Sequence, residues 1–145
     1  MPEPSPEDPW VVRYFRRHPD DDQGQSIPGQ EFLRSCPPRV RAHFFDVLIA
    51  VAKAPPPRFA GGGKWEAMHG DMTGYYEVRV TGPGRHQYRL FCLLEANPPA
   101  PDRQPLLVII TGLDKPSGTT LSAADYGAVR ALGEEYRSRS PRSLA

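Results

Sequence analysis

Long apolar runs and cysteines are scarce in this sequence. The longest apolar stretches, such as Val47 to Ala52 and Leu106 to Ile110, end within a few positions, whereas a membrane-spanning helix needs about 20 apolar residues. The first 15 residues lack the basic-then-apolar order of a signal peptide. The two cysteines, Cys36 and Cys92, could form one disulfide, but free thiols in a reducing compartment are the favoured interpretation. We therefore expect a cytoplasmic protein that does not contact a membrane.

Motifs for metal and nucleotide chemistry are also absent. The chain has no Cys-x-x-Cys or His-x-x-x-His cluster and no strand with neighbouring carboxylates, so zinc and magnesium sites are not expected. The Gly61-Gly62-Gly63-Lys64 stretch lacks the spacing of a phosphate-binding loop and favours a flexible connector. No serine stands in a nucleophile setting. We expect no metal and no small-molecule cofactor, so any catalysis must rest on cations, histidines and tyrosines.

The formal net charge of +1 hides an uneven distribution along the 145 residues, a length that fits one domain. Residues 1–33 hold seven acids and three bases, residues 34–89 hold nine bases and four acids, and residues 90–145 hold six of each. The middle of the chain is therefore basic, which favours a phosphate-bearing partner. A solvated surface of mixed sign is the alternative interpretation.

The order of sequence patterns predicts an α+β domain. Residues 1–9, rich in proline and acids, are expected to form a disordered tail, residues 10–138 the folded domain, and residues 139–145 a flexible tail. From the apolar periodicity and the turn residues we expect the following elements in order: a strand at 10–15, a helix opened by Pro28, a helix after Pro37-Pro38 with the stripe Val40, Phe44, Val47, Leu48 and Val51, a short strand at 64–68, a hairpin of 75–80 and 87–94, a buried strand at 105–111, and a helix capped by Ser122.

Polar and cationic side chains gather on the hairpin. Because alternate residues of a strand share a face, Glu77 and Arg79 project together, as do Arg85, Gln87 and Arg89. If the turn places Arg79 near Arg85, Glu77 faces Gln87 and this face becomes cationic. A shift of one residue would separate the arginines of the two strands. Cross-strand ion pairs on an exposed face are one interpretation, and a bound phosphate that neutralises the arginines is the other.

Three stretches of the chain resemble the signature stretches of the RelE/ParE superfamily of toxins, in its phage-derived, HigB-like branch. They are Gly70 to Arg79, with Tyr-Tyr-Glu-Val-Arg, then Tyr88-Arg89-Leu90-Phe91, then Ile110 to Lys115, with Gly-Leu-Asp-Lys. The resemblance covers residues 10–138. It implies a RelE-like fold, in which two N-terminal helices pack on a small, antiparallel-rich twisted sheet and a C-terminal helix closes the domain.

The resemblance implies a toxin of a type II toxin–antitoxin system. Such a toxin is a metal-independent endoribonuclease that cleaves mRNA on the ribosome through attack of the 2′-hydroxyl, and a helix-turn-helix antitoxin holds it inactive. Arg79 and Arg89 match positions that contact the scissile phosphate. Lys115 matches a second basic position, and Tyr126 approximately matches a tyrosine that stacks on a base or transfers a proton. The remaining candidates are His86 for acid–base chemistry, and Lys64, His69 and Arg85 for RNA binding.

The chain departs from the family pattern at two places. It reads Gly-Leu-Asp-Lys-Pro where the family has Gly-Phe-x-Lys-Lys, so one lysine is missing and Asp114 brings a negative charge near the expected site. Glu77 also occupies a position that is basic in the most active ribonucleases. The alternatives are a non-nucleolytic inhibitor of a protein such as DNA gyrase, as in ParE-like members, and a domesticated module that binds RNA or protein. The low net charge predicts weak binding to free RNA and hence ribosome dependence.

Overall fold

The computed structural model describes residues 10–54 and 64–145. The expected disordered tail at 1–9 and the expected glycine connector at 61–63 lie outside these residues. The elements, in chain order, are β1 (Val11–Tyr14), α1 (Pro28–Ser35), α2 (Pro38–Lys53), β2 (Trp65–Ala67), β3 (Tyr75–Thr81), β4 (Gln87–Glu95), β5 (Leu106–Lys115) and α3 (Ala123–Arg137), with short 3₁₀ turns at Gly70–Met72 and Pro83–Arg85. The α+β class and the order of elements are as expected from the sequence.

The helices begin and end where local chemistry dictates. Pro28 and Pro38 occupy the first positions of α1 and α2, where a missing amide hydrogen costs nothing. The start of α3 is a capping box: the Asp125 amide donates to Ser122 Oγ at 3.1 Å, and the Ser122 amide donates to the Asp125 carboxylate at 2.7 Å. The expected N-cap at Ser122 is confirmed.

The five strands form one mixed sheet in the order β1-β5-β4-β3-β2. β1 pairs in parallel with β5, and the other neighbours are antiparallel. β5 is thus an inner strand, and Leu106 to Ile110 are all buried, as its continuous apolar run predicts. The helix placement differs from the RelE-like expectation of two N-terminal helices, because β1 precedes α1 and α2 and is built into the sheet.

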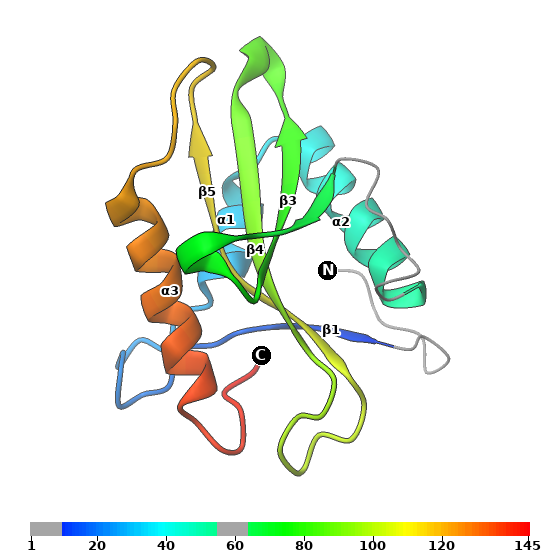
Figure 1. Cartoon of the computed structure of the whole chain (residues 1–145), viewed down its shortest axis with the longest axis vertical. Helices are drawn as coiled ribbons and strands as arrows, with labels where there is room; N and C mark the ends of the chain where they lie inside the picture. Colours follow the sequence, from blue (N-terminus) through cyan, green and yellow to red (C-terminus); the bar gives the residue numbers. More distant parts are fainter. Residues whose placement is uncertain (1–9, 55–63) are drawn as a thin grey trace.

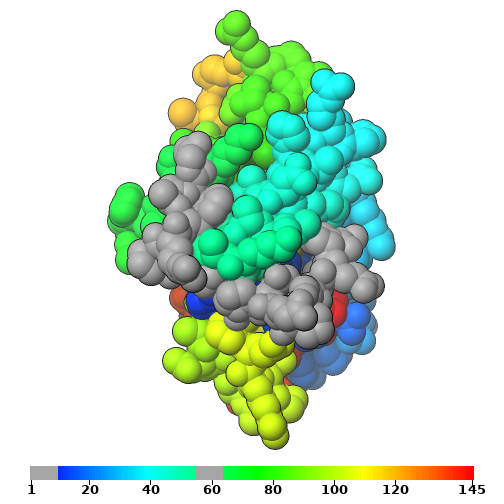
Figure 2. Space-filling model, turned by 90° about the vertical axis from the view of Figure 1, so that its right-hand side faces the viewer, coloured from blue at the N-terminus to red at the C-terminus, as the bar shows by residue number. Residues whose placement is uncertain are grey.

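Helices cover both faces of the sheet (Figure 1). α1 and α2 pack on one face through the stripe expected on α2, which is buried together with Val78, Leu90 and Ile109. α3 packs on the other face through Val129 and Tyr136. We call these the α2 face and the α3 face. Figure 2 looks onto the molecule from the side of α2, which crosses the middle of this view. Each face therefore buries its own apolar cluster, and polar residues on the two faces belong to different sites.

A glycine lets α3 approach the sheet closely. A Cβ at Gly133 would overlap the Tyr75 phenol, and that phenol donates a hydrogen bond to the Arg130 carbonyl at 3.5 Å. Only a residue without a side chain allows the helix to lie this near to β3. This contact fixes the height of α3 over the sheet, and with it the position of the first turns of α3.

The C-terminal residues 139–145 are held in place, in contrast to the flexible tail expected from their polar composition. Arg142 donates to both Glu95 oxygens, at 3.1 and 2.5 Å. Leu144 forms a β-bridge with Phe15, and the Ala145 amide donates to the Tyr14 carbonyl at 2.9 Å. The segment thereby pairs with the end of β1, whose outer edge would otherwise present unpaired backbone groups.

Both cysteines are free and buried, as expected. Burial raises the pKa of the Cys36 thiol to about 11 and also raises the pKa of Cys92. Both side chains belong to the apolar cluster of the α2 face. They are packing residues and not exposed nucleophiles. Among the residues that the structure describes, no helix combines the length and apolar character required to cross a membrane.

Candidate functional site

The two arginines singled out from the sequence lie directly opposite each other on β3 and β4. In the observed register, Arg79 pairs with Arg89 and Glu77 pairs with Phe91. The sequence leaves the register open, and its conditional pairing of Glu77 with Gln87 is not the one observed, because the turn is longer than that pairing requires. It contains a 3₁₀ turn with Gly84 and Arg85 in the left-handed region, at φ 65° and 60°. The shift keeps both arginines on one face of the sheet, the α3 face.

Glu77 binds both arginines at once. Its Oε1 accepts a hydrogen bond from Arg79 Nε and another from Arg89 Nη1, the latter at 3.0 Å. The Glu77 side chain is 2% exposed, that of Arg89 15% and that of Arg79 47%. The ion pairs expected on an exposed face are therefore present, but their acid is buried. One carboxylate between two guanidinium groups holds them together where they would otherwise repel each other.

The cluster has unused hydrogen-bonding capacity. The two guanidinium groups share the Glu77 carboxylate, and Glu66 of β2 forms a longer, exposed salt bridge with Arg79 Nη2, at 3.8 Å. Within the described residues, Glu77 Oε2 and Arg89 Nε are buried without a hydrogen-bond partner. The hydrogen bond to Glu77 raises the pKa of Arg79, so its guanidinium stays charged. We call Glu77, Arg79 and Arg89 the arginine cluster.

Tyr126 brings α3 to the arginine cluster. Its ring meets Phe91 edge to face, with centroids 6.2 Å apart and planes at 88°, and Phe91 is the cross-strand partner of Glu77. The phenol is also close enough to Arg79 to contribute to the raised pKa of that guanidinium. The structure therefore joins Tyr126 to the two arginines, although 37 positions separate it from Arg89 in the sequence.

Lys115 lies on the same face but is engaged elsewhere. It ends β5 opposite Gln87, two pairs beyond Arg89 and Leu113. Its ammonium group donates to the Thr119 carbonyl, which ties down the turn that leads to α3. Lys115 thus adds positive charge at the edge of the site and helps to position the start of the helix.

His86 and Asp114 lie away from the arginine cluster. Asp114 pairs with Tyr88 on the α2 face, and its carboxylate contacts His86 Nε2 at 2.7 Å. The His86 ring stands 5.0 Å from the Tyr88 ring. The structure does not bring His86 to the arginines, and the negative charge of Asp114 is on the opposite side of the sheet from them. The expectation that Asp114 weakens the site is corrected.

The three predicted RNA-binding residues are exposed and separate. Lys64 precedes β2, where its carbonyl accepts from the Arg79 amide at 3.0 Å. Arg85 is at the tip of the hairpin turn. His69 lines a hollow together with Tyr126. Lys64 and His69 therefore each lie next to a residue of the site, Lys64 through its backbone bond to Arg79.

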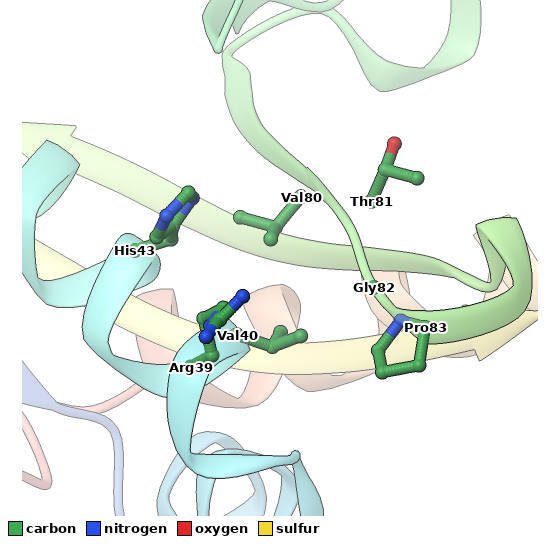
Figure 3. A pocket seen from close by; sticks show the side chains of 7 residues that line it. All are labelled: Arg39, Val40, His43, Val80, Thr81, Gly82 and Pro83. Carbon is green, nitrogen blue, oxygen red and sulfur yellow. The ribbon is translucent and has the colours of Figure 1, made fainter.

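Two of the hollows in the described residues lie on opposite faces of the sheet. One, about 480 Å³, is lined by Arg39 and His43 of α2 and by the end of β3 and its turn (Figure 3). It is on the α2 face and contains no residue of the arginine cluster. The other, about 360 Å³, lies under the first turns of α3 and includes Tyr126. Only the second adjoins the candidate site.

Sequence reasoning missed several residues of this region. Glu66, Asp71, Met72 and Arg130 surround the arginine cluster or the adjoining hollow, but none belongs to a motif. Arg130 follows Tyr126 by four residues on α3, and this spacing could have placed both on one helix face. The others come from β2 and the β2–β3 connection, whose position over the sheet has no local signature.

Comparisons with known proteins return no match to a protein-family model, to a curated protein or to a solved structure. The site is therefore interpreted from its own residues.

Proposed function

We propose that this protein is an RNA-cleaving toxin that cuts mRNA by metal-independent attack of a 2′-hydroxyl on the adjacent phosphate. The observation that carries the proposal is the arginine cluster. Arg79 and Arg89 face each other across β3 and β4, and one buried carboxylate holds both. A pair of aligned guanidinium groups suits a phosphodiester, because each guanidinium can donate to two phosphate oxygens.

This reaction requires stabilisation of the negative charge that develops on the phosphate, and arginines can provide it without a metal. The 2′-oxygen loses its proton and forms a bond to phosphorus, while the bond to the 5′-oxygen breaks and that oxygen takes up a proton. The product is a 2′,3′-cyclic phosphate. Negative charge accumulates on the non-bridging oxygens, and donors fixed beforehand stabilise it without reorganisation. Glu77 supplies that fixation by holding Arg79 and Arg89.

The roles of the other residues follow from their places. Arg79, about half exposed, is the guanidinium that contacts the phosphate, and Arg89 supports it from a more buried position. Tyr126 is the candidate for contact with the attacking or leaving oxygen, and Lys115 adds charge from the end of β5. His86 has no part in this proposal, because it lies on the α2 face.

The partners in this proposal are the ribosome and an antitoxin. A total charge of +1 provides little general attraction for free RNA, so the ribosome presents the mRNA. A helix-turn-helix antitoxin encoded beside the toxin holds it inactive. Covering the arginine cluster would suffice for this, because Arg79 is the exposed member of the cluster.

Primer extension on mRNA after induced expression tests the proposal. Arg79→Ala removes the exposed guanidinium and keeps the Glu77–Arg89 pair, so we expect cleavage to fall by about a hundredfold or more while the protein stays folded. Arg89→Lys keeps a cation for Glu77 but loses the second set of donors, and it should also cleave poorly. Arg103→Ala is the matched control. It removes one exposed arginine from the connection between β4 and β5, at the opposite end of the molecule from the hairpin turn (Figure 1).

The outcomes separate the alternatives. Cleavage of mRNA that is lost in Arg79→Ala but not in Arg103→Ala supports the proposal. Growth arrest with intact transcripts and accumulating DNA damage contradicts it and favours a protein target such as gyrase. Cleavage at the wild-type rate in Arg79→Ala also contradicts it.

A further inference from the structure

The hollow beside the arginine cluster has a defined wall and rim. Met68, His69, Asp71 and Met72 line it from the connection between β2 and β3, and Tyr126 and Arg130 line it from α3. Its volume of about 360 Å³ is in the range of small-molecule sites. We call it the Met68–Arg130 hollow.

The wall is apolar and polarizable. Met72 is 5% exposed, and Met68 and Tyr126 pack partly buried against the cluster of the α3 face. Thioethers and an aromatic ring interact favourably with a flat π-system. An aliphatic ligand would gain less from such a wall than an aromatic one, so the chemistry of the lining favours a planar aromatic group.

The rim carries one cation and one carboxylate that are free of ion pairs. Across residues 10–54 and 64–145, neither Asp71 nor Arg130 takes part in a salt bridge; Arg130 Nη1 contacts only the Met72 sulfur, at 3.6 Å. A carboxylate only accepts hydrogen bonds when ionised, and a guanidinium only donates them. Asp71 and Arg130 together can therefore bind an aromatic ring whose edge carries hydrogen-bond donors next to an acceptor.

Tyr126 connects this hollow to the arginine cluster. It lines the hollow, and it also meets Phe91 and lies near Arg79. Both features are on the α3 face of the sheet. A phosphate held by Arg79 would therefore place an attached nucleoside within reach of the hollow.

We propose that the Met68–Arg130 hollow binds one nucleobase of the RNA next to the phosphate held by Arg79, and that it prefers guanine. This rests on the proposed function. The guanine edge offers N1–H and N2–H to the two oxygens of Asp71 and O6 to the guanidinium of Arg130. The walls of Met68, Met72 and Tyr126 receive the faces of the base.

Binding of nucleoside monophosphates to the full chain, followed by calorimetry, tests this without requiring cleavage. The probes are the 3′- and 5′-monophosphates of guanosine, adenosine, cytidine and uridine, with inorganic phosphate as reference. We expect guanosine monophosphate, in one of its isomers, to bind about tenfold or more tightly than inorganic phosphate, because base stacking adds to the phosphate contact. Equal affinity for all nucleotides and inorganic phosphate would overturn the inference.

Two variants that each remove one negative charge test whether the base binds in the Met68–Arg130 hollow. Asp71→Asn removes the carboxylate from the rim and should reduce the preference for guanosine over adenosine by about tenfold. Glu134→Gln removes the same charge from an exposed position of α3 that does not line the hollow, and the preference should not change. Affinity for inorganic phosphate should be the same in both. A preference unaltered by Asp71→Asn, or lost equally in Glu134→Gln, refutes the base site.

Cleavage assays distinguish this inference from the proposed function. Wild-type protein that binds guanosine monophosphate through Asp71 but leaves mRNA intact refutes the nuclease and supports the base site. Protein that cleaves mRNA at positions unaffected by Asp71→Asn refutes the base site and supports the nuclease.

Discussion

Neutralising Glu77 should destabilise the protein and disable its site, although the change makes the site more positive. Glu77→Gln keeps the size of the side chain and an oxygen that can accept a hydrogen bond, but it removes the buried negative charge. Arg79 and Arg89 then face each other across the two strands without a buried counter-charge between them, and only the exposed Glu66 remains beside Arg79. The variant therefore tests whether Glu77 positions the two guanidinium groups or only reduces the positive charge of the site.

The burial of Glu77, Arg79 and Arg89 determines how much free energy of unfolding each substitution removes. Breaking a buried ion pair by removal of one member costs about 3–5 kcal/mol. Arg89, at 15% exposed, has little access to water, whereas Arg79, at 47% exposed, can turn outward. We therefore expect a loss of about 3 kcal/mol for Glu77→Gln, near the lower limit, and a similar loss for Arg89→Ala. Arg79→Ala leaves the Glu77–Arg89 pair in place and should cost about 1 kcal/mol or less.

Urea unfolding followed by tryptophan fluorescence measures these losses, because Trp65 is buried in β2 beside β3. The midpoints and slopes of the three variants give their free energies of unfolding. A Glu77→Gln variant within 0.5 kcal/mol of wild type, about the effect of an ordinary surface substitution, would refute the reasoning. Equal losses for Arg79→Ala and Arg89→Ala would also refute it. In folded Glu77→Gln protein, faster mRNA cleavage would show that Glu77 only weakens the cations, and slower cleavage that it positions them.

Three further predictions concern the scaffold. Gly133→Ala should cost about 1–3 kcal/mol by forcing α3 off the sheet, while the control Gly127→Ala, where a Cβ meets only the end of a flexible side chain at 3.7 Å, should be neutral or stabilising in thermal unfolding. Burial keeps the Cys36 thiol protonated, with a pKa of about 11, so both cysteines should react with a thiol reagent at pH 8 only after denaturation; fast reaction of the native protein would contradict the buried packing. Burial alone would raise the pKa of Glu95, but hydrogen bonds, that of Arg142 first, hold the pKa below its ordinary value. The resulting stability is present above the unfolded pKa of about 4.3 and is lost as pH falls through the lower folded pKa, and Arg142→Ala should flatten this loss in urea titrations at pH 3–7.

Local sequence patterns were sufficient to predict the helices, the strands and the apolar face of α2. The stripe on α2, the N-cap at Ser122 and the buried run of β5 were read from neighbouring residues, and each is in the structure. Proline positions located the boundary between α1 and α2. These features depend on periodicity and capping, which act over a few residues and therefore leave a signature in the chain.

The candidate site was only partly predictable. Glu77 and Arg79 share a face because side chains alternate along a strand. Which residues of β4 lie opposite them depends on the register of the hairpin. The left-handed residues of the turn set that register, and Arg85 at φ 60° has no sequence signal for this conformation. The same register places Asp114 and His86 on the far face, away from the arginines beside which they are expected from the sequence.

The sequence by itself determined which residues form strands and helices, which positions are apolar, and that Glu77 and Arg79 share a face of their strand, because each of these depends on contacts between near neighbours. The tertiary structure alone decided that Arg79 and Arg89 face each other, that Glu77 is buried, that Tyr126 packs on Phe91 and lines a hollow with Arg130, and that the C-terminal segment pairs with β1. Those outcomes depend on strand register and on which helix covers which face. They are set by packing between segments far apart in the chain, which no local pattern records.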